Sequence, residues 1–443
     1  MLESKAKMNE ATQYAEILSK MIQEETISSI ENHSSRKFDQ FRELLKKLFP
    51  ALYSICTVYN FRDGIVLRWA GEEIKSPVLF MNHHDVVEAS GKWKYEPFSG
   101  VIVDNKLWGR GTLDDKGGLW AMLQAAEELV REGFHPTCDI WFSSSSTEET
   151  TGEGAREIAN WFIDQGIHFR MSFDEGGMII YDPIGGANGT FAMIGVGEKG
   201  CADLKFVARS NGGHASTPPR DTPLVRLGKF MVAAERDNLF ETKLSPTICE
   251  MFRRFSPYMR KTGIILRHPE KYSALIIRII PKVSTTAAAL FRTTIAFTMA
   301  KGSEGLNVIP QEAWVTGNMR FSHHQGREKS FEVINRLAKK YGLKMEIINP
   351  GETSGITDYN GDAFQLTERA VKKIFPNVEP VPYIMTGASD SRFFDKVSDQ
   401  CIRFLPFQID KQQLGSMHGI DENVNLVALS PAVAFYRYLY QEV

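Results

Sequence analysis

The apolar run Val78-Leu79-Phe80 leads directly into the polar segment Met81-Asn82-His83-His84-Asp85. Such a run is typical of a buried strand, and its polar continuation predicts side chains delivered to the rim of a sheet. In open α/β sheets, ligands bind at this rim. His83 and Asp85 share one face of an extended chain, so the carboxylate can orient an imidazole that binds a metal. Taken alone, the segment more often marks a polar cluster at a strand end than a metal site.

Two further predicted strands also end in acidic residues. Cys138-Asp139-Ile140-Trp141-Phe142 is followed by four Ser residues and then by Glu148-Glu149, and Phe169-Arg170-Met171-Ser172-Phe173 runs into Asp174-Glu175. Neighbouring carboxylates permit a division of labour, with one as metal ligand and one as general base. An isolated Glu pair is more often a solvated loop. The repetition of His, Asp and Glu after successive strands therefore favours one shared site.

A glycine-rich turn adds a third acidic pair, Asp114-Asp115, which lies between Gly109-Arg110-Gly111 and a helix predicted to run to about Glu132. A glycine-rich turn before a helix can also bind phosphate. Neither the phosphate-loop motif nor the dinucleotide fingerprint is present, and two adjacent carboxylates would repel phosphate. We therefore interpret this turn as part of the acidic site.

The composition of the chain argues against several classes of binding partner. A net charge of -2 argues against a nucleic-acid surface, which would need a basic patch. No uninterrupted apolar segment reaches the ~18 residues of a membrane span, and no signal peptide is read at the N-terminus. Five scattered Cys residues suit a reducing compartment better than a disulfide framework. We expect a cytoplasmic protein that binds neither membrane nor nucleic acid.

The motifs together resemble those of the M20 family of dinuclear zinc peptidases and amidohydrolases, which includes aminoacylases and Gly-X carboxypeptidases. They occur in the family's order and span most of the chain, with one departure where Glu88 replaces a frequent proline. The five motifs are His83-His84-Asp85-Val86-Val87, Gly109-Arg110-Gly111-Thr112-Leu113-Asp114-Asp115-Lys116-Gly117, Glu148-Glu149, Asp174-Glu175-Gly176 and His418-Gly419-Ile420-Asp421-Glu422.

The resemblance implies a ligand set for two metal ions. Asp114 would bridge both ions, His83 and Asp174 would complete one site, and Glu149 and His418 would complete the other. The ions implied are two Zn²⁺ per chain, with Mn²⁺ or Co²⁺ as alternatives.

The resemblance also implies roles for residues that do not bind metal. Glu148 would act as general base, and Asp85 would orient His83. The fourth acidic ligand stays open, because both Asp174 and Glu175 can reach the site. Asp174 is preferred from its alignment after Ser172-Phe173.

The middle of the chain predicts a second domain. Strands and helices follow one another there as β-α-β-β-α-β, the ferredoxin-like plan, and this resembles the lid or dimerisation domain of the family. The expected fold is α/β, with a mixed sheet flanked by helices from residues 1–197 and 351–443 and an inserted α+β lid from 198–350. The segment from about Asp237 to Leu290 is longer than the plan needs, as in the Gly-X carboxypeptidase branch.

Several residues resemble substrate contacts of the family. In family dimers the residue matching His214 reaches the partner's active site and stabilises the oxyanion, which implies a homodimer formed through the lid. Arg320 suits a substrate carboxylate because a guanidinium binds it bidentately, although a surface role is equally compatible with the sequence. The remaining candidates are Asn307, Gly387 and Ser389. Gly387 and Ser389 lie in a loop that resembles a family motif, in which positions 388 and 389 differ from the usual residues.

Three functions compete. The first is a carboxypeptidase or dipeptidase that cleaves next to a free C-terminal amino acid, with water activated by two metals and Glu148. The second is an N-acyl-amino-acid amidohydrolase on the same site. The third is a catalytically silent peptide-binding homologue, against which the full ligand set and Glu148 argue. The substrate would be a small peptide or an N-acyl amino acid.

Overall fold

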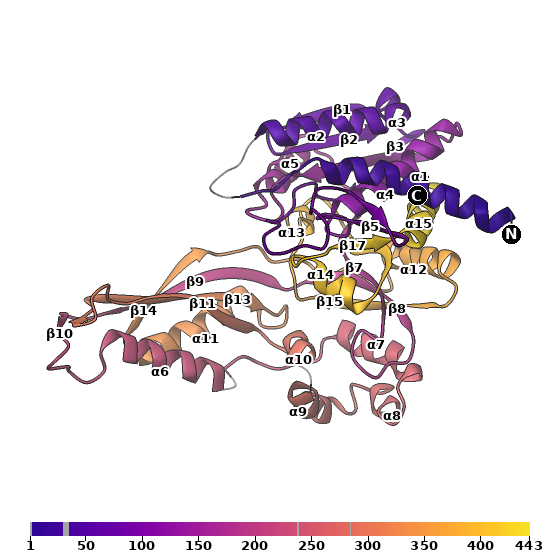
Figure 1. Cartoon of the computed structure of the whole chain (residues 1–443). Coiled ribbons are helices and arrows are strands. Elements are labelled where there is room, and N and C mark those ends of the chain that lie inside the picture. Colours follow the sequence, from indigo (N-terminus) through magenta and orange to yellow (C-terminus); the bar gives the residue numbers. More distant parts are fainter. Residues whose placement is uncertain (1, 30–34, 237–238, 284) are drawn as a thin grey trace.

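The computed structural model describes residues 2–29, 35–236, 239–283 and 285–443. A large mixed sheet with helices forms one half of the molecule, and a second, antiparallel sheet extends from it as an arm (Figure 1). Both chain ends lie in the large half, so the arm is an insertion into it. The fold is the predicted α/β catalytic unit with an inserted lid.

The catalytic sheet has eight strands in the order β1-β2-β6-β3-β7-β16-β8-β15. Its central strands β3, β6, β7 and β16 are parallel to their neighbours in that group, and β1 and β2 are antiparallel. The strands are β1 (Thr57–Phe61), β2 (Gly64–Trp69), β3 (Glu73–Met81), β6 (Cys138–Ser145), β7 (Met171–Tyr181), β8 (Thr190–Glu198), β15 (Val378–Met385) and β16 (Cys401–Ile409).

Both faces of this sheet are covered, which explains its uninterrupted apolar strands. Along β3, Val78 and Phe80 join the larger core on one face, while Leu79 and Met81 join a smaller core on the other. The larger core is covered mainly by α1 (Leu2–Gln23), α2 (Ser35–Leu48), α3 (Pro50–Ile55), α4 (Lys116–Arg131), α12 (Asp362–Ile374) and α15 (Leu429–Glu442), and the smaller by α5 (Glu153–Asp164) and α13 (Ser391–Phe394).

The lid follows the predicted ferredoxin-like plan. Its sheet has the order β11-β13-β9-β14, with every pairing antiparallel, and its helices cover one face around a separate core. Its elements in chain order are β9 (Gly200–Arg209), α6 (Pro223–Arg236), β11 (Thr294–Lys301), β13 (Glu312–Phe321), α11 (Gly326–Lys340) and β14 (Leu343–Asn349). A short ribbon of β10 (Gly213–His214) and β12 (Val308–Ile309) lies at the far end of the arm (Figure 1).

The long segment between α6 and β11 does not belong to the core of the lid. It packs instead against β8 and β15, the outer strands of the catalytic sheet, where Phe252 and Phe255 meet Phe191 and Val381. We call this segment the helical insertion; its elements are α7 (Pro246–Phe255), η1 (Ser256–Tyr258), α8 (Gly263–Leu266), α9 (Ser273–Val283) and α10 (Thr285–Phe291). The extra length seen in the sequence thus forms a fourth apolar cluster.

Short elements near the C-terminus complete the catalytic half. A three-stranded sheet joins β4 (Ile102–Val103) and β5 (Lys106–Trp108) to β17 (Asn423–Asn425), next to α14 (Lys411–Ser416) and η2 (Leu426–Ala428). All five Cys residues are free. In the part of the chain that the structure describes, no helix combines the length and apolar character that crossing a membrane requires.

Candidate metal centre

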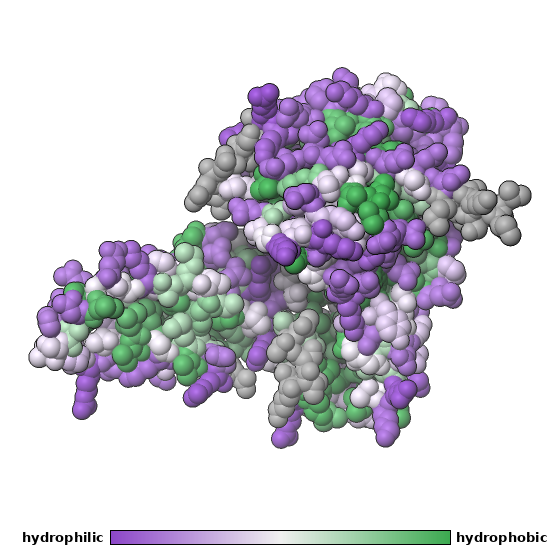
Figure 2. Space-filling view, viewed as in Figure 1, coloured by the Kyte–Doolittle hydropathy of each residue, from purple (hydrophilic) through white to green (hydrophobic). Residues whose placement is uncertain are grey.

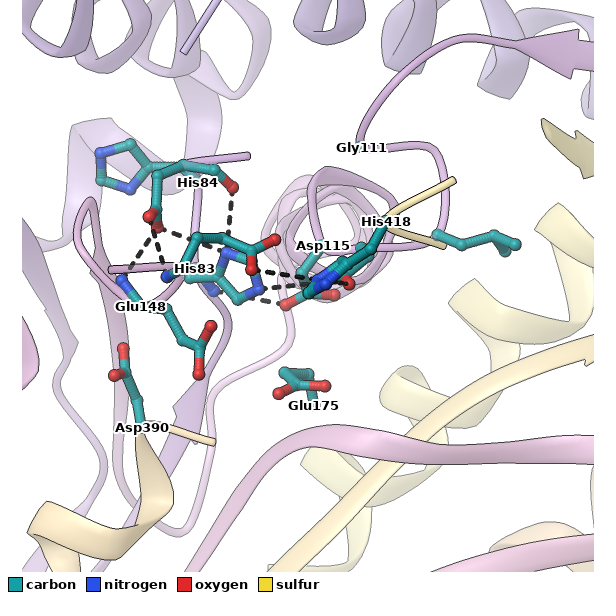
Figure 3. Close-up of polar contacts among 12 residues, drawn as sticks. His83, His84, Gly111, Asp115, Glu148, Glu175, Asp390 and His418 are labelled. Atoms are coloured by element: carbon teal, nitrogen blue, oxygen red, sulfur yellow. Dashed lines mark hydrogen bonds and ion pairs between the residues drawn. The ribbon is translucent and has the colours of Figure 1, made fainter. Parts of the chain in front are cut away.

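The predicted polar clusters meet at one edge of the catalytic sheet (Figure 3), although the strand expected to end at Phe173 continues to Tyr181. His83 follows β3, Glu148 and Glu149 follow β6, and Glu175 lies within β7. Asp114 comes from the turn before α4. His418 arrives from the loop after α14, far along the chain, with a positive φ of 57°.

Asp114 stands between the two imidazoles. Its Oδ1 lies 3.1 Å from Nε2 of His83, and its Oδ2 lies 3.0 Å from Nε2 of His418. Nε2 of His418 also lies 3.0 Å from Oε2 of Glu149. One possible ligand atom from each of His83, Asp114 and Glu149 falls within 4.8 Å of the others. A carboxylate with one oxygen toward each imidazole is the arrangement that a bridging ligand requires.

Asp85 holds two parts of this centre together. Its side chain is fully buried, and its Oδ1 lies 3.4 Å from Nδ1 of His83, whose ring is also 3.0 Å from the Asp85 carbonyl oxygen. The same carboxylate accepts hydrogen bonds from the backbone N–H groups of Glu148 (3.2 Å) and Glu149 (3.1 Å). Ser28 donates a further bond of 2.6 Å. Asp85 therefore contacts His83, the residue that it was predicted to orient, and also holds the turn with the two glutamates.

Glu422 fixes the turn with Asp114, a role that the sequence did not reveal. Its buried carboxylate accepts from the backbone N–H groups of Leu113 (2.8 Å), Asp114 (3.1 Å) and Gly111 (3.0 Å). Arg110 adds a charge-assisted bond of 2.7 Å. Glu422 follows His418 by four residues, so one loop supplies an imidazole and holds the opposite carboxylate.

Glu148 lies beside His83, with a largely buried side chain and two further acids close by. Burial raises the pKa of Glu148 well above its usual range; Asp390 and Glu149 raise it further, while His83 and Arg392 oppose them. Nη1 of Arg392 lies 3.7 Å from Oε1 of Glu148. Burial also raises the pKa of Asp390 to about 7. Asp390 precedes α13 and Arg392 lies in its first turn, next to the predicted residues Gly387 and Ser389. Neither was among the site residues predicted from the sequence.

The geometry separates Asp174 from Glu175. Both oxygens of Asp174 accept backbone hydrogen bonds, 2.7 Å from Ser391 N–H and 3.0 Å from Glu175 N–H. Figure 3 shows the carboxylate of Glu175 directly below the imidazoles and Asp115. Burial, followed by the charges of Asp114 and Asp174, raises the pKa of Glu175 well above its usual range. Glu175 is thus the acid with oxygens available to the centre.

The donor set fits divalent cations. Burial acts to raise the pKa of Asp114, but hydrogen bonds to His418 and His83 outweigh it and lower that pKa. The same contacts with Asp114 and Glu149 raise the pKa of His418 to about 10. Oε1 of Glu149 is buried without a hydrogen-bond partner among the described residues. Crowded carboxylates, two imidazoles and an unsatisfied buried oxygen are the chemistry that a metal ion satisfies.

A sequence comparison decides the family. The family model described as "Peptidase family M20/M25/M40" matches residues 79–442, which include every residue of the centre. The chain belongs to peptidase family M20/M25/M40. It is thus a metallo-hydrolase of the M20 peptidase and amidohydrolase type.

Relatives of this M20 chain are named either as carboxypeptidases or as N-fatty-acyl-amino acid synthase/hydrolases. A "Probable carboxypeptidase S-like 2" of Dictyostelium discoideum is 31% identical over 442 residues, covering 96% of this chain and 84% of the relative. The human "N-fatty-acyl-amino acid synthase/hydrolase PM20D1" is 29% identical over 439 residues, covering 96% and 87%. Among solved structures, the M20 metallo-carboxypeptidase Sso-CP2 of Sulfolobus solfataricus superposes with a TM-score of 0.70 at 17% identity, covering 96% of this chain and 97% of that one.

Two predicted substrate residues of the M20 chain lie far from the centre in their own chain. His214 is exposed in β10, where it pairs with Val308, and its Nδ1 lies 2.7 Å from Oγ of Ser216. The carbonyl oxygen of Asn307 accepts a hydrogen bond of 2.9 Å from the N–H of Ala215, so Asn307 lies next to the β10 segment with His214. Figure 1 places this ribbon at the tip of the arm.

The other three substrate candidates lie closer to the catalytic half. Half-buried Arg320 is in β13 opposite Cys201, two residues into β9, and its charge helps to lower the pKa of buried Lys199. Gly387 is exposed, with open space where a Cβ would stand. Ser389 is fully buried and donates a 2.8 Å bond to Glu198. This geometry gives Ser389 a scaffold contact and leaves Gly387 and Arg320 available to a ligand.

Proposed function

We propose that this M20 protein hydrolyses the amide bond to the nitrogen of an amino acid that has a free carboxylate. The observation that carries the proposal is the Asp114 carboxylate placed between His83 and His418, with Glu148 beside it. These groups form a two-ion site next to a buried carboxyl that can exchange a proton.

In this proposal the ligands are His83, Asp114, Glu149, His418 and Glu175. Glu175 takes the place first given to Asp174, because the oxygens of Asp174 accept backbone bonds. Two Zn²⁺ ions are the proposed cofactors, with Mn²⁺ or Co²⁺ as substitutes. When bound, such ions lower the pKa of water from 15.7 toward ~7 and stabilise negative charge on a carbonyl oxygen.

Glu148 then takes a proton from the attacking water and delivers it to the leaving amine. A carboxyl pKa raised by burial toward the working pH favours both steps, because the group must accept and later release the same proton. Arg392 near Oε1 and the Asp85 bonds to the Glu148 backbone restrict where the carboxylate can lie.

Arg320 should bind the free carboxylate of the substrate, so activity should depend on that group. We expect Arg320→Ala to lose about 10–100-fold in kcat/KM, since a charge-assisted contact contributes on the order of 1.5–3 kcal/mol. The wild-type enzyme should discriminate similarly between a dipeptide and its C-terminal amide. Steady-state kinetics on that pair test the idea, with Arg336→Ala on lid helix α11 as control; equal turnover of acid and amide would rule it out.

The group on the other side of the scissile bond distinguishes two versions of the proposal. The carboxypeptidase-type name of one relative favours a peptidyl group, and the name of the human relative favours a fatty acyl group. A panel of dipeptides and N-acyl amino acids of increasing acyl length separates them by kcat/KM. No turnover anywhere on the panel by the Zn²⁺-loaded enzyme would contradict the proposal.

We also propose that the active enzyme is a homodimer formed through the lid, with His214 acting on the partner's site. His214 lies at the tip of the arm, and helix α6 exposes Leu224 (50%), Val225 (45%) and Val232 (47%). An imidazole aimed at the oxyanion would supply about 2.7–4 kcal/mol, the effect of one such donor.

Mixing two inactive variants should therefore restore activity. Glu148→Gln and His214→Ala chains combined as heterodimers create one site with an intact Glu148 and a partner's His214. Recovery approaching a quarter of wild-type activity is expected from random exchange, because half of the dimers are mixed and each has one working site. Subunit exchange is verified with differently tagged chains; exchange without recovery would show that His214 does not act in trans.

A further inference from the structure

The helical insertion contains a cavity of about 400 Å³ that shares no residue with the metal centre. Its walls come from α7, α8, α9, α10 and the connection between β7 and β8. Apart from Thr262 and Gly185, every lining residue has an apolar side chain; examples are Met251, Phe252, Leu266 and Ile276. The volume and composition are those of a small-molecule site. Nothing in the proposed hydrolysis uses it.

The mouth of the cavity is apolar and open. Leu275 (41% exposed) and Ile279 (47%) both line the cavity and reach the surface, and nearby Ile264 is 73% exposed. Figure 2 shows hydrophobic atoms among hydrophilic ones at the lower edge of the molecule, where Figure 1 places α8 and α9. A hydrocarbon chain can therefore enter from solvent between these side chains.

Cations flank the lining residues. Residues 251–292 contain nine Lys or Arg and a single acidic residue, Glu270, in a chain whose net charge is -2. Arg260 and Lys261 stand between the lining residues Met259 and Thr262. Arg267 follows Leu266, and Arg278 lies between Ile276 and Ile279.

These four basic side chains are exposed, and none has a carboxylate partner among the residues that the structure describes. The two acids within residues 246–292 are already paired: Glu250 with Arg253 and Arg254, and Glu270 with Arg253. The unpaired charge beside an apolar mouth attracts an anionic group at the surface.

We propose that this cavity binds the hydrocarbon chain of a long-chain fatty carboxylate, with the carboxylate at the basic rim. The apolar walls match the chain, and the unpaired cations match the head group. A single hydrocarbon chain is favoured over a lipid bilayer, because most of the apolar side chains line a cavity of about 400 Å³, which a single chain can enter. The site is separate from hydrolysis and holds whether or not the proposed function is correct.

Calorimetric titration of the Glu148→Gln enzyme with decanoate, dodecanoate and tetradecanoate, all below their aggregation concentrations, tests the proposal. One molecule should bind per chain. Affinity should rise roughly fourfold for each added methylene, the equivalent of ~0.8 kcal/mol, and should fall with increasing salt. Dodecan-1-ol should bind several-fold more weakly than dodecanoate, because it lacks the charge.

Variants locate the bound chain. Leu275→Glu combined with Ile279→Glu places two carboxylates at the mouth and should weaken dodecanoate binding at least tenfold. Both positions are exposed, so folding should be retained, which circular dichroism checks. Ile348→Glu, at a 59% exposed position in lid strand β14, is the matched control and should leave binding unchanged.

Three results would overturn the proposal. Binding that ignores the mouth substitutions but disappears in Arg320→Ala would place the fatty carboxylate at the catalytic site. Equal affinity across chain lengths would mean that no cavity takes up the chain. Binding to phosphatidylglycerol vesicles without any binding of free dodecanoate would identify the basic face as a lipid-surface contact instead.

Discussion

Glu148→Gln should retain the metal content of the wild-type enzyme while losing ~10²–10⁴-fold or more in kcat. The Gln amide has nearly the same shape as the Glu148 carboxyl, so it can occupy the same position near Arg392. It cannot accept and return a proton. The turn itself is held through backbone N–H groups donating to Asp85, which the substitution does not alter. Metal analysis and steady-state kinetics on the same preparation measure the two quantities.

Glu149→Gln is the matched control for that variant. Oε2 of Glu149 lies 3.0 Å from Nε2 of His418, so this substitution should lower metal content as well as rate. If Glu148→Gln lost metal while Glu149→Gln kept it, the roles of the two glutamates would be reversed.

Asp114→Asn should lower occupancy of both metal positions at once. Its two oxygens face different imidazoles, and an amide offers a neutral oxygen on one side and an N–H donor on the other. Loss of an outer-shell partner costs ~10–100-fold in metal affinity, so losing the shared ligand should cost at least as much at each position. Metal analysis after dialysis against a weak chelator measures the remaining stoichiometry.

His418→Ala provides the comparison, because His418 faces one side of Asp114 and should affect mainly one ion. We expect close to one metal per chain in that variant and far less in Asp114→Asn. About two metals per chain in Asp114→Asn would refute the bridging role.

Much of this architecture could be predicted because its signals are local. The run from Val78 to Met81 reads as a strand covered on both faces, and the structure places its alternate side chains in two different cores. The order of elements in the lid likewise follows from short periodic segments. His83 and Glu149 follow strands whose ends the sequence marks, and Asp114 precedes a helix whose start the sequence marks with glycines.

The remainder depends on contacts that no local pattern reports. Glu422 and Asp114 are 308 residues apart, and only the fold shows that one holds the other's backbone. Asp174 and Glu175 are chemically similar neighbours, and which one is available depends on the backbone N–H of Ser391. The helical insertion has amphipathic helices, but their packing against β8 and β15 is a tertiary contact that the local sequence does not specify.

The contact between Glu422 and the Asp114 turn also determines when, during synthesis, the turn can reach its final structure. At about 5–20 residues per second of synthesis, Asp114 exists roughly 15–60 s before the residue that holds it. During that interval the acidic turn lacks both its carboxylate clamp and its second imidazole, while the lid between them can already form its own core. Completion of the proposed two-metal site must therefore follow synthesis of nearly the whole chain, and a fragment ending before His418 would lack both the second imidazole and the Glu422 carboxylate.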